Sequence, residues 1–199
     1  MISVPFAVLR HAPTVWNAEK RLQGMSDTPL SAEGEARART WRLPAPADSW
    51  RRFSSPLQRA RRTAELLQPG APVTIDRRLR EMSFGIWEGL SIAELRATIG
   101  ERFIQAEQRG LDFEPPGGES PRQVMARLAD FTAELARGGR PAVIVAHKAV
   151  LRALLALATG WDMTGRQPVK LDWHCLHYFA ATPDGRVTLE RPNVTLATP

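Results

Sequence analysis

The residues of this chain best suited to chemistry are two histidines that each follow an apolar stretch. His11 comes after Arg10 at the end of residues 4–10, and His147 comes after the apolar run of residues 142–146. In an open α/β sheet such stretches are buried strands, and ligands bind where the carboxyl ends of the strands meet. We therefore expect both imidazole rings to point into one cleft.

A neutral imidazole beside fixed guanidinium groups is suited to attack on a phosphoryl group. A ring nitrogen of His11 would be the nucleophile, and Arg10 would offset the charge on the phosphate oxygens. Arg59 lies on the first turn of a helix that Pro56 opens after the next predicted strand, and it supplies a second guanidinium. Together with His147 these residues predict a pocket that binds a phosphate group from several sides.

The alkoxide that leaves a phosphate ester needs a proton, and two carboxylates in residues 79–89 could donate it. We favour Glu81, because a carboxylic acid is a suitable donor and a bound phosphate dianion raises its pKa. Glu88 is the rival, and we interpret it as a structural carboxylate beside Trp87. Trp16 and Trp87 are close enough to these motifs to line a substrate pocket.

The apolar periodicity and the turn residues predict strands that alternate with helices. Predicted strands cover residues 4–10, 52–55, 73–75, 142–146, 169–180 and 187–189. Predicted helices cover residues 32–42, 57–67, 91–99, 101–108, 121–137 and 150–158. This order is typical of a three-layer α/β/α sandwich with a mostly parallel sheet, and residues 90–120 would form a small helical cap over its carboxyl edge.

Length and composition fit one domain over residues 1–199 of a soluble globular protein, with 43% hydrophobic and 24% charged residues. The single cysteine, Cys175, excludes an intramolecular disulfide and fits a reducing compartment. The N-terminus shows no basic segment followed by a long apolar core, so we expect no signal peptide and a cytoplasmic location. Residues 149–158 are too few to span a bilayer, so we expect no membrane partner.

The formal net charge of +6 raises the question of nucleic-acid binding. The basic residues are nearly all arginine and are scattered among acids. The chain has no lysine-rich tail and no row of aromatic residues interleaved with basic ones. We therefore expect a small anionic molecule as the partner, and no nucleic acid.

A set of short motifs follows the chain from end to end. The motifs are Leu9-Arg10-His11 with Thr14 and Asn17, Arg21-Leu22-Gln23-Gly24, residues 27–31, residues 54–60 with Thr63-Ala64, Leu79-Arg80-Glu81, residues 84–89, residues 116–120, and Val145-Ala146-His147. The set resembles the histidine phosphatase superfamily, whose fold is phosphoglycerate-mutase-like, in its short bacterial phosphatase branch. Any single motif is modest evidence, whereas the whole set in family order is very specific.

The resemblance implies a phosphomonoester hydrolase that forms a phosphohistidine on His11. Arg10, Arg59 and His147 would complete the phosphate pocket. Glu81 would first be the proton donor and later the base that activates water. The resemblance also implies that no metal ion and no cofactor take part, because arginine and histidine side chains neutralise the phosphate charge. The substrate would be a small phosphorylated metabolite, of the sugar phosphate or α-ribazole phosphate type.

The resemblance further implies that Asn17 and the backbone around Gln23 and Gly24 contact the phosphate or the substrate. The chain departs from the family at two places. Residues 12–13 are Ala-Pro where the family usually has Gly and then an acid or Gln. After the second histidine the family usually has two small residues, and here the first is Lys148. Lys148 either adds positive charge at the mouth of the pocket or faces solvent.

Two other functions remain open at this stage. A phosphoglycerate-type mutase would return the phosphoryl group to a second hydroxyl of the substrate. The mutases of the family are longer and carry other residues at positions 23–25 and 81–85, and no extra basic motif stands out here for a second phosphate. A binding module on the same fold would bind a phosphate ligand without catalysis, but the intact set of candidate catalytic residues argues against it.

Overall fold

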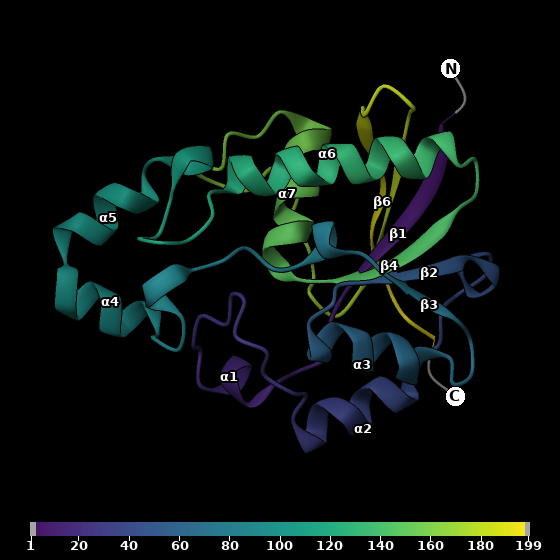
Figure 1. Cartoon of the computed structure of the whole chain (residues 1–199), viewed down its shortest axis with the longest axis horizontal. Helices are drawn as coiled ribbons and strands as arrows, with labels where there is room; N and C mark the ends of the chain where they lie inside the picture. The colour runs from purple at the N-terminus through teal and green to yellow at the C-terminus, as the bar shows by residue number, and fades with distance from the viewer. Residues whose placement is uncertain (1–2, 198–199) are drawn as a thin grey trace.

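A six-stranded sheet forms the centre of the computed structural model, which describes residues 3–197 (Figure 1). Its strands are β1 (Val4–Arg10), β2 (Arg51–Ser54), β3 (Val73–Ile75), β4 (Ala142–Ala146), β5 (Leu176–Ala181) and β6 (Val187–Val194). They lie in the order β3-β2-β4-β1-β5-β6. The first four run parallel, and β5 is antiparallel to both of its neighbours. The expected α/β fold with a mostly parallel sheet is confirmed.

Helices cover both faces of the sheet (Figure 1). The α-helices are α1 (Val15–Ala18), α2 (Ala32–Thr40), α3 (Gln58–Leu67), α4 (Ile92–Ile99), α5 (Glu101–Glu107), α6 (Pro121–Arg137) and α7 (Lys148–Thr159). Short 3₁₀ turns are η1 (Ala47–Ser49), η2 (Arg77–Leu79), η3 (Gly85–Trp87) and η4 (Gly110–Asp112). Helices α6 and α7 pack on one face of the sheet, and α2 and α3 pack on the other.

Strand β1 is apolar from Val4 to Leu9 because each of its faces meets a separate core. Phe6 and Val8 join the core under α6 and α7, whereas Ala7 and Leu9 join the core under α2 and α3. Alternate side chains of a strand point to opposite faces, so a strand covered on both sides reads as a continuous apolar run. The first polar residues after such a run mark the edge of the sheet.

The register of the sheet brings the two candidate histidines to the same level. Arg10 at the end of β1 is paired with Ala146 at the end of β4. The backbone N–H of His11 donates a 2.9 Å hydrogen bond to the carbonyl of Ala146, which precedes His147. Because the neighbouring strands are parallel, the segments that follow them emerge together at one edge.

Helices α4 and α5 lie apart from the sheet at one end of the molecule (Figure 1). They belong to the segment expected to form a helical cap. A small core of Trp87, Leu95 and Phe103 holds this segment together, and Phe113 packs against it. Ser91 begins α4 with a capping box, in which its hydroxyl accepts a hydrogen bond from the backbone N–H of Glu94.

The structure corrects several predicted boundaries. The predicted strand 169–180 begins only at Leu176, the first residue of β5, because the residues before it form a turn next to Asp172. The Asp172 carboxylate accepts a hydrogen bond from the backbone N–H of His174, and the Asp172 N–H donates to the side chain of Asn193. Strand β6 continues well past the predicted 187–189, α2 ends at Thr40, and α7 begins directly after His147. Within residues 3–197, no helix is both long and apolar enough to cross a membrane.

Candidate active site

His11 lies at the carboxyl end of β1 with its side chain almost fully buried. Its Nδ1 is 2.8 Å from the carbonyl oxygen of Ala12, which can only accept a hydrogen bond. Nδ1 therefore carries the proton, and the lone pair is on Nε2. Burial and the nearby Arg10 and Arg59 guanidinium groups hold the pKa of His11 well below its usual range. The ring is neutral and suited to act as a nucleophile.

Arg59 is the largest fully buried side chain of the described residues. It lies on the first turn of α3, and its terminal nitrogens donate to the carbonyls of Ser26 and Gly24 at 2.8 and 2.7 Å. These two bonds fix the guanidinium and leave its Nε without a partner in the described chain. The Nε of Arg10 is also buried and lacks a partner there. Both arginines therefore keep a donor for a ligand.

His147 is fully buried beside His11, with 5.2 Å between the ring centroids. Its Nε2 is 2.7 Å from the hydroxyl oxygen of Ser55. That hydroxyl also accepts a hydrogen bond from the N–H of Leu57, and it can donate its own proton to Nε2. In this tautomer the ring proton is on Nδ1, which has no partner within residues 3–197. His147, like Arg10 and Arg59, presents an unused donor.

Glu81 is buried in the segment between η2 and η3. Its Oε1 accepts hydrogen bonds from the backbone N–H groups of Met82 and Ala149, at 3.0 and 3.1 Å. Burial raises the pKa of this carboxyl, and the attraction of Arg59 and Arg10 opposes the shift only in part. A raised pKa keeps a carboxylic acid protonated to higher pH, as a proton donor requires.

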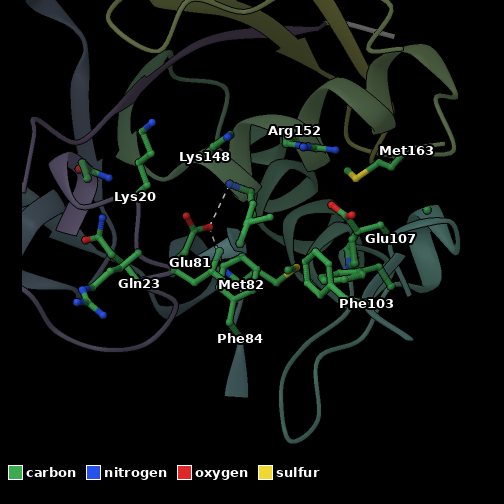
Figure 2. Close-up of a pocket in the computed structure, with 18 of the residues that line it drawn as sticks. Lys20, Gln23, Glu81, Met82, Phe84, Phe103, Glu107, Lys148, Arg152 and Met163 are labelled. Atoms are coloured by element: carbon green, nitrogen blue, oxygen red, sulfur yellow. Dashed lines mark hydrogen bonds between the residues drawn. The ribbon is translucent and has the colours of Figure 1, made fainter. Parts of the chain in front are cut away.

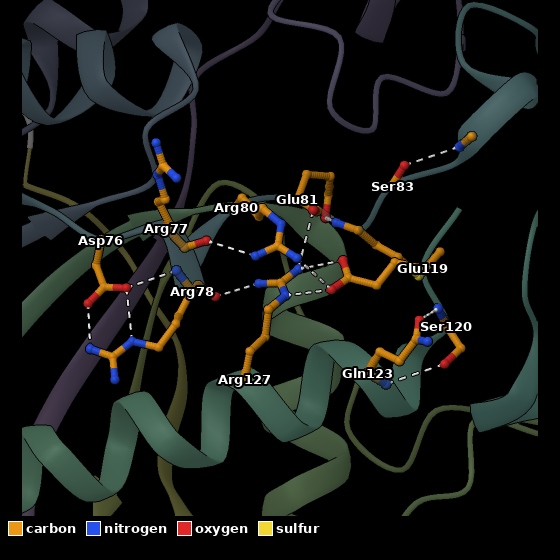
Figure 3. Close-up of polar contacts among 12 residues, drawn as sticks. Asp76, Arg77, Arg78, Arg80, Glu81, Ser83, Glu119, Ser120, Gln123 and Arg127 are labelled. Carbon is orange, nitrogen blue, oxygen red and sulfur yellow. Dashed lines mark hydrogen bonds and ion pairs between the residues drawn. The ribbon is translucent and has the colours of Figure 1, made fainter. Parts of the chain in front are cut away.

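A buried ion pair holds the backbone of the Glu81 segment (Figure 3). Arg127 of α6 pairs with Glu119 at 2.9 Å, and their side chains are only 10% and 11% exposed. Arg127 also donates to the carbonyl of Glu81 at 3.2 Å and to the carbonyl of Arg78. Arg80 also pairs with Glu119, at 3.1 Å. This Glu119–Arg127 pair is the clamp that fixes the Glu81 main chain.

Glu88 is the structural carboxylate that the sequence indicated. Its two oxygens accept hydrogen bonds from the backbone N–H groups of Met25, Ser26 and Phe84, and from the hydroxyl of Ser26 at 2.6 Å. It thereby joins the loop before α2 to the segment that carries Glu81. Gly24 lies against this carboxylate with φ of 52°, and a Cβ there would come within 2.1 Å of Glu88 Oε1.

A cavity of about 850 Å³ opens in front of these groups (Figure 2). Arg10, His11 and Glu81 line one end of it, and residues of α5 line the other. The predicted substrate-binding residues Asn17, Gln23 and Lys148 also line it. Three further predicted residues, Arg59, His147 and Gly24, are not among the residues that line this cavity.

The two tryptophans expected at the pocket have different positions. Trp16 lines the cavity, whereas Trp87 packs against Phe103 and Phe113 in the small core of the cap segment. The prediction for Trp87 is therefore wrong, because proximity along the chain does not reveal which side of a turn meets solvent. Arg152, which sequence reasoning did not assign to the site, also lines the cavity. The sequence could have indicated this position, because Arg152 comes four residues after Lys148 and residues with that spacing lie on the same side of a helix.

No group of three or more histidine, cysteine or acidic side chains within residues 3–197 could hold a metal ion. The ionisable groups that gather at the candidate site include arginines, neutral histidines and a carboxylate with raised pKa. Guanidinium groups bind phosphate oxygens through paired hydrogen bonds, and the neutral imidazole of His11 supplies a nucleophile. The arrangement therefore has the groups needed to bind a phosphate group and to accept a phosphoryl group on a histidine nitrogen.

Comparison with known proteins supports this interpretation. A family model for the histidine phosphatase superfamily, branch 1, matches residues 6–195. The chain is 33% identical over 162 residues to 2,3-bisphosphoglycerate-dependent phosphoglycerate mutase 2 of Gloeobacter violaceus. The matched region covers 74% of this chain and 72% of that protein.

Two solved structures have the same fold. The mycobacterial glucosyl-3-phosphoglycerate phosphatase, in complex with inorganic phosphate, is 28% identical with a TM-score of 0.74, and the match covers 98% of each chain. The α-ribazole phosphatase of Shigella flexneri is 26% identical with a TM-score of 0.80, over 98% of this chain and 100% of that one. The relatives thus include both phosphatases and a mutase.

Proposed function

This chain belongs to branch 1 of the histidine phosphatase superfamily, and from that premise we propose that it hydrolyses phosphomonoesters through a phosphohistidine on His11. The observation that carries the proposal is the set of unused buried donors beside a neutral imidazole. Arg10 Nε, Arg59 Nε and His147 Nδ1 all lack partners within the described chain. Phosphate oxygens would satisfy them, and the Nε2 lone pair of His11 would face the phosphorus.

In the first step, Nε2 of His11 attacks phosphorus and forms a P–N bond as the P–O bond to the substrate's alcohol breaks. The leaving alkoxide takes the proton of Glu81 and departs as the alcohol. The arginines and His147 hold the charge that spreads over the phosphoryl oxygens. The Nδ1–H of His11 keeps its hydrogen bond to the Ala12 carbonyl, and this bond stabilises the positive charge that the ring gains.

In the second step, the ionised Glu81 accepts a proton from a water molecule as the water oxygen attacks phosphorus. The P–N bond breaks, its electron pair returns to Nε2, and inorganic phosphate leaves. His11 and Glu81 are then back in their starting protonation states. The phosphate bound in the mycobacterial relative shows that a protein of this fold holds this product.

The test is to mix the purified protein with ³²P-labelled sugar phosphates and other small phosphomonoesters, and to quench the reaction in alkali. We expect acid-labile label on His11 together with released inorganic phosphate, and neither in His11→Ala. Lys170→Ala, which changes a side chain outside the cavity, is the control. Label that moves to another hydroxyl of the substrate would make the protein a mutase, and a folded protein without label would make it a binding module.

We propose a small phosphorylated metabolite as the substrate, of the kind named for the two phosphatases of this fold. The cavity extends from His11 to α5, which leaves room for a body of sugar or nucleoside size beyond the scissile phosphate. The ester that labels His11 fastest would identify the substrate class.

A further inference from the structure

Helix α7 presents two cations to the cavity beyond the phosphate end. Lys148 and Arg152 are four residues apart, so they lie on the same side of the helix, one turn from each other. Both line the cavity, and Figure 2 shows them along the same wall. Lys148 directly follows His147, which places this pair next to the candidate phosphate site.

Neither cation has an acidic partner in the part of the chain that the structure describes. No hydrogen bond or ion pair within residues 3–197 uses the Lys148 ammonium or the Arg152 guanidinium. Instead, each lies against an indole ring, with Lys148 Nζ 5.2 Å from the centroid of Trp173 and Arg152 Cζ 5.1 Å from that of Trp161. Cation–π contacts of this kind hold a cation in place and leave its hydrogen-bond donors free.

The other charges of the cavity do not neutralise the pair. Glu107 lines the cavity but pairs with Arg96 at 2.9 Å. Glu81 faces Arg10 and Arg59 and is the proton donor of the proposed reaction. Burial lowers the pKa of both α7 cations. At Lys148 the repulsion of Arg10 and Arg152 adds to the effect, and the attraction of Glu81 opposes it only in part. An anion placed between them would relieve this cost.

We propose that Lys148 and Arg152 form a subsite for a second acidic group of the substrate, separate from the phosphate that is transferred. The inference rests on the proposed function, which it narrows to phosphomonoesters that also carry a carboxylate or another phosphate. A guanidinium and an ammonium bind either group through charge-assisted hydrogen bonds. The apolar residues that also line the cavity, among them Phe84, Phe103 and Met163, would contact the uncharged part of the substrate.

The probes are pairs of esters that differ in one acidic group. 3-Phosphoglycerate is compared with glycerol 3-phosphate, and 4-carboxybenzyl phosphate with benzyl phosphate, so that a short and a long separation are both tested. Propane-1,3-diyl bisphosphate, compared with 3-hydroxypropyl phosphate, distinguishes a second phosphate from a carboxylate. For each pair, kcat/KM is measured with the active protein and Kd by calorimetry with His11→Ala.

We expect the acidic member of at least one pair to be preferred by about tenfold or more, the effect of one charge-assisted contact. Lys148→Met and Arg152→Met keep much of the apolar stem and remove the charge, so each should lower the preference. The double variant should bring the ratio close to one. Arg152→Lys should retain part of it, and Arg61→Met, which removes an exposed cation of α3 outside the cavity, should not change it.

The subsite would be overturned if the protein without substitutions showed equal kcat/KM and equal Kd for the two members of every pair. A preference for the acidic member that survives in the double variant would also overturn it. Neither result affects the proposed function, which depends on label at His11 with the neutral esters. If no ester is hydrolysed, the proposed reaction is wrong, and the Kd ratios with His11→Ala still decide whether α7 binds a second acidic group.

Discussion

At the scale of single residues, the site depends on which ring nitrogen of each histidine carries the proton. The Ala12 carbonyl holds the proton of His11 on Nδ1, and a Ser55 hydroxyl that donates to Nε2 of His147 places the proton of that ring on Nδ1 as well. The two rings would nevertheless have different functions. In the proposed reaction, His11 would use its free Nε2 as the nucleophile, whereas His147 would use its Nδ1–H as a donor to the phosphate.

Removal of the Ser55 hydroxyl should therefore impair the reaction more than the fold. In Ser55→Ala, the His147 ring loses the partner that sets its tautomer, and we expect kcat/KM to fall about tenfold, the usual value of one buried hydrogen bond to a polar group. Ser55→Thr keeps a hydroxyl and should recover most of the activity. Steady-state kinetics and thermal unfolding measure the two effects.

The neighbouring Ser54 supplies the matched control for this prediction. It is equally buried, and its hydroxyl donates to the carbonyl of Ser55 at 3.0 Å without contacting His147. Ser54→Ala should lower the unfolding temperature to a similar extent and leave kcat/KM near the original value. Equal losses of activity in both alanine variants would show that Ser55 acts only through packing.

The pKa shifts of His11 and Glu81 predict a bell-shaped pH dependence for the formation of the phosphohistidine. His11 must be neutral, and its pKa is lowered, so the rate falls only when the pH drops well below the usual histidine range. Glu81 must be protonated, and its pKa is raised, so the rate falls as the pH rises through a value above that of an ordinary glutamate. Single-turnover kinetics with an alkyl phosphate measure both limbs.

Glu81→Gln tests the assignment of the alkaline limb. The amide keeps an oxygen for the Met82 and Ala149 N–H groups but has no acidic proton to give. With an alkyl ester the rate should fall by ~10²–10⁴, and the alkaline limb should disappear. With 4-nitrophenyl phosphate, whose leaving group needs no proton, the first step should slow by less than about tenfold. A uniform loss with both esters would contradict the role of Glu81 as the acid.

At the scale of elements, the ends of β1 and β4 position the histidines, and α6 positions the acid. The clamp of Glu119 and Arg127 is buried, and Glu119→Gln leaves the Arg127 charge uncompensated, whereas in Arg127→Met the Glu119 carboxylate still pairs with Arg80. We expect Glu119→Gln to lower the free energy of unfolding by about 3–5 kcal/mol and Arg127→Met to lower it by less, as measured in urea. Glu134→Gln, which breaks the exposed contact with Arg78, should cost less than about 1 kcal/mol.

The double variant Glu119→Leu/Arg127→Met separates stability from position. Two apolar side chains of similar size can replace a buried pair at little cost, so much of the stability should return. The hydrogen bond from Arg127 to the Glu81 carbonyl would still be absent. Hydrolysis of alkyl phosphates should therefore stay low, whereas 4-nitrophenyl phosphate should be less affected. Recovery of both activities would show that the clamp has no part in placing the acid.

The sequence predicted those elements whose identity depends on neighbouring residues. The apolar runs of β1 and β4 and the polar residues after them located His11 and His147, because burial on both faces leaves a continuous apolar pattern. The start of β5 could not be predicted, since the turn before it depends on a contact between Asp172 and Asn193, which are 21 positions apart. The same limit hid the contact of Ser55 with His147, 92 positions away.

At the scale of the whole molecule, the apolar residues are divided unequally among three cores. Two large ones lie on the faces of the sheet, whereas the cap segment is held by Trp87, Leu95 and Phe103 with a few partly buried neighbours. Burial of little apolar surface gives a segment little stability of its own. We propose that α4 and α5, within the cap segment of residues 90–120, open and close over the cavity while the sheet stays folded, within one domain.

Hydrogen exchange tests this division directly. Backbone amides of α4 and α5 should exchange much faster than those of β1 and β4, because local opening needs less free energy than global unfolding. Phe103→Ala removes a buried ring worth about 3–5 kcal/mol, so it should speed exchange in α4 and α5 and leave β4 protected. Phe131→Ala, in the core under α6, should instead speed exchange throughout the chain. If Phe103→Ala had that global effect too, the cap and the sheet would unfold as one unit, and access to His11 would not depend on the cap.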